Sequence, residues 1–215
     1  GKSDFYELST LELARLYYFQ KKMYDSAQFY FQTLYEQASD NENRLEGLRG
    51  LVRSYYQQGS YEHAKEKADE LLKSKGVSAD DKIIAWMVLA KSQQSEGHCD
   101  SAVLTYKNII SVSKSFWGGE ARYESASCYF QQKKFKLSEK MAMSVINETG
   151  SYDVWVTKAY LLLGDIFMEQ RDYFNAKATY ESISKNATDP VIKEEAQRKY
   201  NDAVLMESRN GKLKN

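Results

Sequence analysis

The chain has 215 residues, of which 42% are hydrophobic and 28% charged, a balance that supports a packed core and argues against global disorder. Its 30 basic and 30 acidic residues cancel, so we expect neither nucleic acid nor an anionic membrane surface among its partners. The longest apolar run, residues 83–90, is too short to cross a bilayer, so we expect a protein that is not membrane-embedded.

A spaced set of small and aromatic residues recurs five times along the chain. In residues 160–180 an aromatic residue is followed at fixed spacing by Leu-Gly, a second aromatic residue, an Ala and a third aromatic residue. The small residues that anchor the copies stand at positions 27, 64, 102, 138 and 176, which are 37, 38, 36 and 38 residues apart. Such regular spacing predicts a repeat protein. The recurring positions are filled by Ala27; Tyr55 and Ala64; Trp86, Leu89, Ala90, Ala102 and Tyr106; Ala126; and Leu163, Gly164, Phe167, Ala176 and Tyr180.

Each copy is predicted to form two amphipathic helices, because its apolar residues recur every three or four positions. In the first pair Arg15 stands where the other copies have a small residue, so we expect this helix to be shifted by one residue, with Leu13 and Ala14 as the packing pair. In chain order the sequence predicts helix pairs over about 8–43, 45–81, 83–118, 119–155 and 157–188, a capping helix over 190–207 and a frayed tail over 208–215.

The small residues of two paired helices are predicted to face each other where the helices cross. An interaxial distance of about 8–10 Å leaves no room there for a larger side chain. One pair cannot bury its own apolar face, so we expect the pairs to be stable only when they stack on one another.

Over about residues 8–188 this pattern resembles the tetratricopeptide-repeat (TPR) family, most specifically in residues 86–106 and 160–180. The period is a few residues longer than the usual 34, and the Pro expected at the end of each second helix is missing. The resemblance implies an all-α fold, a right-handed α-α superhelix of about five TPR-like helix pairs plus a C-terminal capping helix. It implies one solenoid over residues 1–215 that acts as a scaffold for protein–protein interaction.

The last repeats also resemble the C-terminal end of long exported bacterial TPR arrays, on residues that include Trp155, Leu162, Gly164 and Phe174. Gly1 stands where Met is expected, which favours a fragment excised from a longer protein. We therefore expect the bacterial periplasm or cell envelope in preference to the cytoplasm.

The chain lacks the motifs that carry common enzyme chemistry. It has no P-loop, no dinucleotide-binding glycine motif, no HExxH and no nucleophile elbow. Cys99 and Cys128 are too far apart for a metal-binding pair, and His98 beside Cys99 has no third ligand nearby in the sequence. We expect two free thiols, no catalytic residues, no metal and no cofactor.

Charged and aromatic residues on the first helices predict a binding groove on the concave face that the resemblance implies. Arg49 and Arg53 are four residues apart, and Lys91 holds the place of Arg53 one repeat later, which predicts a basic strip. Aromatic side chains continue the surface, so we expect a peptide or partner helix in which acidic and apolar residues alternate. The predicted groove residues are Arg49, Arg53, Tyr56, Lys91, Tyr123 and Phe130.

Two alternatives remain open at this point. The cations of the strip would need no ligand if they serve as surface partners for Glu46 or Glu96. The chain would have no dedicated groove ligand if it is a structural segment of a longer repeat array that self-associates through its exposed first helix.

Overall fold

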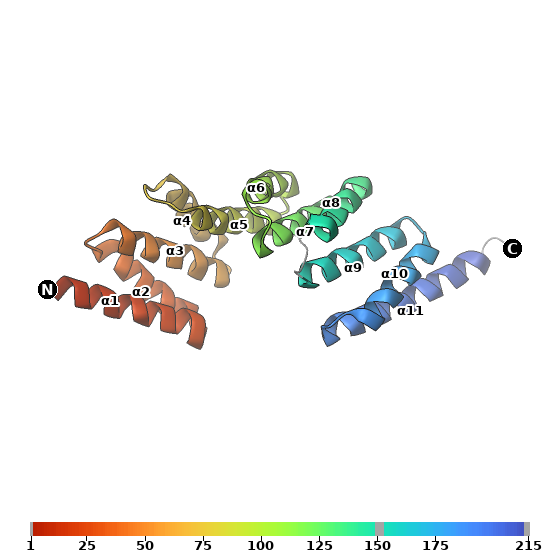
Figure 1. Cartoon of the computed structure of the whole chain (residues 1–215), viewed down its shortest axis with the longest axis horizontal. Coiled ribbons are helices and arrows are strands. Elements are labelled where there is room, and N and C mark those ends of the chain that lie inside the picture. The colour runs from red at the N-terminus through yellow and green to blue at the C-terminus, as the bar shows by residue number, and fades with distance from the viewer. Residues whose placement is uncertain (1, 149–152, 213–215) are drawn as a thin grey trace. The chain divides into compact units, whose positions relative to one another are not determined.

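The computed structural model describes residues 2–148 and 153–212, and within these ranges the chain is helical with no strand (Figure 1). Short turns join successive helices, and successive helices from α1 to α5 and from α7 to α11 pack side by side. The elements are α1 (Lys2–Arg15), the π-helix η1 (Leu16–Lys21), α2 (Tyr24–Gln37), α3 (Asn41–Gln57), α4 (Tyr61–Lys73), α5 (Ala79–Ser95), α6 (Cys99–Val112), α7 (Phe116–Gln131), α8 (Phe135–Glu148), α9 (Asp153–Glu169), α10 (Tyr173–Asn186) and α11 (Pro190–Lys212).

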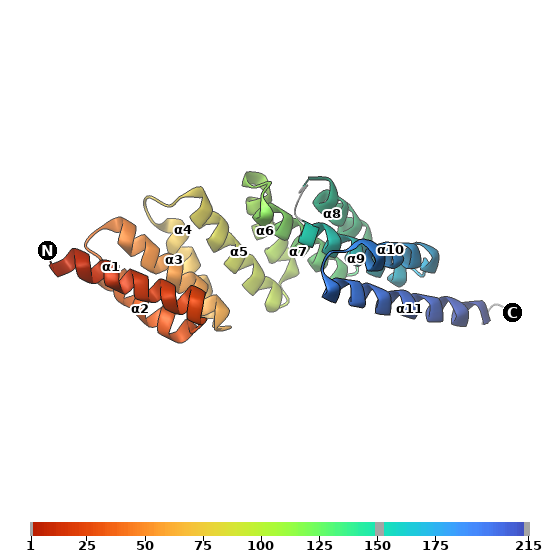
Figure 2. The same cartoon turned by 60° about the horizontal axis from the view of Figure 1, so that its bottom comes forward.

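The helices divide into two compact units, residues 1–109 and residues 110–215, called here the N-terminal and C-terminal units. The single solenoid over residues 1–215 stays a prediction, and residues 149–152 of the predicted fourth repeat lie outside the described residues. In the C-terminal unit α9 packs against α7, α8 and α10, and α11 runs beside α10 (Figure 2). In the N-terminal unit α3 packs against α2, α4 and α5.

Each unit has a core built from the recurring positions. In the N-terminal unit, small residues such as Ala27 and Ala64 are fully buried among Leu, Val and Phe side chains. In the C-terminal unit, Ala126 and Ala176 are fully buried in the same way, and Tyr180 fills the space between α9 and α10. The small residues at these recurring positions are therefore core residues.

Gly164 lies against the ring of Tyr180. A methyl group in place of its hydrogen would overlap that ring. The approach of Gly164 to Ala176 that the repeat pattern predicts stays a prediction. Gly50 of α3 is placed against the ring of Phe31 in a similar way. At both crossings glycine makes room for an aromatic ring of the second helix, and the ring then supplies most of the buried apolar area.

The first helix pair contains one residue more than the others. Ala14 and Ala27 are separated by 13 positions, whereas Gly164 and Ala176 are separated by 12. The π-helix η1 absorbs the extra residue, since a π-turn contains one residue more than an α-turn. Ala14 is consequently fully buried and Arg15 is exposed, which confirms the predicted shift at Ala14, but Leu13 is 38% exposed and does not pack as predicted.

The turn inside each helix pair ends in a residue with left-handed backbone. Gly59 and Gly97 have φ values of 74° and 83°, as predicted for helix C-termini. Lys133 and Arg171 adopt the same conformation without glycine, at φ values of 58° and 62°. The position is therefore fixed by the turn and not by the residue type.

Helix α11 is longer than the predicted cap. It begins at Pro190, as expected for a first helical position, but continues to Lys212 through residues that the sequence predicts to fray. Two side chains hold this extension against α10: Lys177 Nζ lies 2.5 Å from Glu207 Oε2, and Asn210 Nδ2 donates to Tyr173 Oη at 3.3 Å. Residues 213–215 of the predicted tail lie outside the described residues.

Candidate protein-binding surface

The six predicted groove residues fall into two sets. The N-terminal unit holds Arg49, Arg53 and Tyr56 on α3 and Lys91 on α5, and the C-terminal unit holds Tyr123 and Phe130 on α7. Each set is described within its own unit. The continuous groove through all six residues stays a prediction.

Arg49 joins α3 to the beginning of α5. Its Nη2 donates to Asp81 Oδ2 at 2.8 Å, its Nε also donates to the Asp81 carboxylate, and its Nη1 donates to Glu46 Oε2 at 2.9 Å. Asp81 closes the N-terminus of α5 with Ser78, whose backbone N–H donates to Asp81 Oδ2 at 2.9 Å. The Arg49 side chain therefore has a structural role within the N-terminal unit.

The charge of Asp81 is stabilised where it lies. Burial acts to raise the pKa of its carboxyl group, but hydrogen bonds from Arg49 and Ser78 outweigh burial and hold that pKa below its ordinary value. The paired carboxylates in turn raise the pKa of the Arg49 guanidinium. This pair is consistent with the open alternative in which a groove cation serves as a partner for carboxylates on neighbouring helices.

The other predicted residues of the N-terminal unit are half-buried. Tyr56 lies against Tyr61 with ring centroids 5.6 Å apart. Burial raises the pKa of the Tyr18 hydroxyl, and the positive charge of Arg53 acts in the opposite direction. Lys91 lies on the same helix as Asp81, ten residues later.

In the C-terminal unit a cavity of about 240 Å³ opens on the side chains of the first helices. The half-buried Phe130 and Met168 supply its apolar surface. The cavity is lined by Phe130 of α7, Asp165, Met168 and Glu169 of α9, Tyr180 of α10, and Lys199 and Asp202 of α11.

Both carboxylate oxygens of Asp165 form contacts with side chains of the cavity lining. Lys199 Nζ lies 2.6 Å from its Oδ1 and 2.8 Å from its Oδ2, and Tyr180 Oη donates to Oδ1 at 2.6 Å. Burial, followed by the neighbouring Asp165 carboxylate, raises the pKa of the Tyr180 hydroxyl well above its ordinary range. Tyr180 therefore stays a neutral donor.

Glu169 and Asp202 differ from Asp165 because they are exposed at the cavity. Across residues 2–148 and 153–212 neither of them forms an ion pair. The only cation in the described lining, Lys199, is already bound to Asp165 and lies 3.6 Å from Glu195 Oε1. This lining therefore carries an excess of negative charge.

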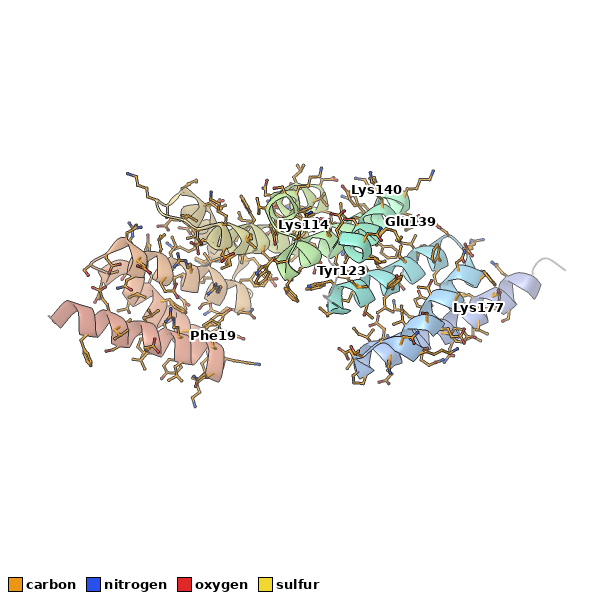
Figure 3. All side chains as sticks on the ribbon, in the orientation of Figure 1. Phe19, Lys114, Tyr123, Glu139, Lys140 and Lys177 are labelled. Atoms are coloured by element: carbon orange, nitrogen blue, oxygen red, sulfur yellow. The ribbon has the colours of Figure 1, made fainter. Side chains whose placement is uncertain are left out.

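Tyr123 lies on α7, seven residues before Phe130 (Figure 3). The ring centroid of Tyr123 lies 5.6 Å from that of Trp155 and 5.8 Å from Lys158 Nζ. Burial and then the nearby carboxylates of Glu124, Asp165 and Glu195 raise the pKa of the Tyr123 hydroxyl to about 12. Carboxylates from α7, α9 and α11 thus act together on one surface.

The comparisons with known proteins agree with this architecture. A tetratricopeptide-repeat family model matches residues 158–189, which covers most of α9 and all of α10. The crystal structure of BtubC (BKLC) from P. vanneervenii is similar to this chain with a TM-score of 0.64 and 15% identity, covering 96% of this chain and 84% of that one. A thermophilic TPR protein of Thermus thermophilus is similar with a TM-score of 0.57 and 17% identity, covering 93% of this chain and 99% of that one.

Residues 158–189 thus match a tetratricopeptide repeat, and the chain as a whole has the fold of TPR proteins. The comparisons confirm the predicted fold class, an all-α helical repeat superhelix. No curated protein matches it in sequence. TPR folds generally mediate protein–protein interaction and are typically scaffolds without enzyme activity. Within the described residues no helix is long and apolar enough to cross a membrane.

Sequence reasoning missed three of the cavity's charged residues, Glu169, Lys199 and Asp202. A signal for Lys199 was available, because it stands 37 residues after Leu162 of α9, the same spacing that relates Ala196 to Ala159. Aligning α11 as a sixth first helix, and not only as a cap, would have placed its polar residues on the same surface as those of α9. Lys199 and Asp202 are therefore recoverable from the repeat spacing.

Proposed function

We propose that this protein is a binding scaffold for another protein, and that the partner contacts the first helices of the C-terminal unit. The observation that carries the proposal is the open cavity between α7, α9 and α11, with two half-buried apolar side chains on it. The proposed contact surface, called here the first-helix surface, consists of Tyr123, Phe130, Met168, Glu169, Lys199 and Asp202.

The composition of this surface supports the proposal. Aromatic residues and Met are enriched at the centres of protein interfaces, whereas charged residues gather at the rim. Phe130 and Met168 are half-buried, and Glu169 and Asp202 are exposed beside them. All these residues lie on packed helices, so binding would cost little ordering of the backbone.

In the N-terminal unit we propose a smaller role for the predicted strip. Arg49 is held by Asp81 and Glu46. We expect a partner to contact Arg53, Tyr56 and Lys91, which the sequence places on the same strip. The proposal for these three residues rests on their place in the sequence and on their partial exposure. It is separate from the proposal for the first-helix surface.

The proposal is tested by capturing a partner from the native cell with the parent protein and repeating the capture with variants. Met168→Gln keeps the length of the side chain while removing its apolar character, and Phe130→Thr removes the ring. We expect each variant to weaken capture by about tenfold or more, since centrally buried apolar residues dominate interface energies. Melting curves show whether Phe130→Thr has unfolded the C-terminal unit.

Phe174→Ser is the matched control, because Phe174 is 74% exposed on α10 and does not line the cavity. It should leave capture unchanged. Equal capture by Met168→Gln and the parent protein, with both folded, would contradict the proposal.

A second candidate function, self-association, is favoured by the apolar side chains of the first helix pair. Phe5 and Trp155 hold equivalent positions, nine residues before the small residues Ala14 and Gly164. The Phe5 side chain is nevertheless 78% exposed, whereas that of Trp155 is only 7% exposed. Phe29 of α2 is also 65% exposed. We propose that the exposed side chains of Phe5 on α1 and Phe29 on α2 contact the same side chains of a second copy of the chain. Light scattering should then show a dimer that becomes a monomer in the double variant Phe5→Ser with Phe29→Ser, whereas a monomeric parent protein would contradict the idea.

A further inference from the structure

We infer that the cavity between α7, α9 and α11 accepts a cationic side chain, Arg or Lys, from the partner protein. This inference rests on the proposed function of the first-helix surface and specifies the chemistry of the partner. The partner expected from sequence alone was acidic, because the predicted basic strip of Arg49, Arg53 and Lys91 determined that expectation, and these three residues lie in the N-terminal unit.

The charges around the cavity determine the sign of the occupant. Asp165 and Lys199 neutralise each other through two contacts of 2.6 and 2.8 Å. The carboxylates of Glu169 and Asp202 then remain without a neutralising cation in the lining. A further carboxylate, that of Glu195, lies 3.6 Å from Lys199 Nζ. An incoming carboxylate would meet this excess of negative charge, and it would have to displace Asp165 in order to reach Lys199. An incoming cation would meet two exposed carboxylates that form no ion pair in the described parts of the chain.

The size and apolar lining of the cavity fit one long side chain. Its volume of about 240 Å³ lies below the roughly 300–1,000 Å³ of pockets that hold small molecules. Phe130 and Met168 offer apolar surface to the methylene groups of Arg or Lys, whose charged end then reaches the carboxylates. An aromatic ring beside a guanidinium group adds a cation–π attraction.

A larger cavity of the C-terminal unit gives no comparable indication. It lies between α9 and α10 and has a volume of about 450 Å³. None of the ten described residues that line it is charged. Such a lining does not favour one sign of charge in an occupant. The charged cavity is therefore the place where the structure specifies a partner chemistry.

The experiment uses the whole 215-residue chain and three peptides that differ only at the central position: acetyl-Ala-Leu-Arg-Leu-Ala-amide and its citrulline and Glu counterparts. Citrulline has nearly the shape of Arg but no charge. Binding is followed by amide chemical shifts in NMR. We expect the Arg peptide to shift signals of α7, α9 and α11 and to bind about fivefold or more tightly than the citrulline peptide, because the carboxylates at the cavity favour a cation.

The double variant Glu169→Gln with Asp202→Asn should remove this preference, so that the Arg and citrulline peptides bind alike. Its matched control is Glu66→Gln with Asp69→Asn, which removes two exposed carboxylates from α4 of the N-terminal unit and should leave the preference intact. Melting curves of both double variants should match the parent protein, since all four side chains are exposed.

Three results would overturn the inference: equal binding of the Arg and citrulline peptides to the parent protein, tighter binding of the Glu peptide, or no shifts with any of the three. Its failure is distinguishable from that of the proposed function. If Met168→Gln abolishes capture of the native partner while the double variant Glu169→Gln with Asp202→Asn captures it normally, the surface binds a partner but not through a cation. If the Arg peptide binds as expected while Met168→Gln captures the native partner normally, the scaffold proposal for this surface fails.

Discussion

Lys199 of α11 binds Asp165 of α9 through both carboxylate oxygens, at 2.6 and 2.8 Å, and thereby joins the last helix to the pair before it. Both side chains are about three-quarters buried, so the pair is shielded from solvent more than most surface ion pairs. The contact links residues 34 positions apart. It has consequences for stability that are separable from binding.

Lys199→Met should destabilise the C-terminal unit by about 1–3 kcal/mol, because Asp165 loses its partner while remaining largely buried. Urea unfolding measures the loss, and hydrogen exchange should show it first in α11. Lys185→Met is the control, since the pair of Lys185 with Glu181 is exposed on both sides and contributes little. Equal losses in the two variants would show that the buried pair has no special role.

Gly164→Ala should destabilise the protein by about 1–3 kcal/mol, because the added methyl group overlaps the ring of Tyr180. The same change in a background of Tyr180→Leu should cost less, since the smaller side chain leaves room for the methyl group. Thermal melting of the four proteins gives this coupling directly. Additive losses would mean that Gly164 is required for another reason.

Deleting the exposed Phe19 should convert η1 into α-helix and restore the spacing of 12 residues found between Gly164 and Ala176. We expect stability to change by less than about 1 kcal/mol, since the deletion removes the extra residue and replaces π hydrogen bonds by α ones. Deleting Gln57, the last residue of α3, should be more destabilising because this helix pair already has the spacing of 12 residues, from Val52 to Ala64, and the deletion would shift α4 out of register. Circular dichroism and melting curves distinguish the two cases.

The pair of Arg49 and Asp81 predicts a dependence of stability on acid pH. The folded state holds the pKa of Asp81 below that of the unfolded chain, so the pair stabilises the protein at pH values above the unfolded pKa. This contribution is lost as the pH falls through the folded pKa, that is, in the range below about pH 4. Asp81→Asn should therefore lower stability at neutral pH and reduce the further loss of stability in acid.

The neighbouring Asp80 provides the control for this prediction because it is exposed in the same first turn of α5. Urea unfolding at several pH values should give the same acid dependence for Asp80→Asn as for the parent protein. If Asp81→Asn also follows the parent curve, the ion pair with Arg49 does not control acid stability.

The repeat positions were predictable because they are local. Ala14, Ala27 and Gly164 were found by spacing alone. The structure buries Ala14 and Ala27 completely and places Gly164 against the ring of Tyr180 on the paired helix. The same spacing indicated that the first helix is shifted at Arg15. It did not reveal that a π-helix produces the shift, because the choice between α and π hydrogen bonds depends on the packing of both helix ends.

The candidate site was predictable only in part. Phe130 was named from its place in the repeat, and it lines the cavity. Arg49 was named on the same reasoning, but its charge is bound by Asp81, which lies 32 positions later. A local pattern places a side chain on a face of its helix and does not show which distant carboxylate will reach it.

The sequence by itself determined that this protein is a helical repeat, because periodic apolar positions and small crossing residues are properties of short segments that recur at fixed spacing. Only the tertiary structure decided which charges are already paired and which are exposed. Those pairings join residues more than thirty positions apart, as Arg49 with Asp81 and Lys199 with Asp165. They depend on how neighbouring helices stack, so the cavity that offers Glu169 and Asp202 to a partner exists only once α7, α9, α10 and α11 have packed together.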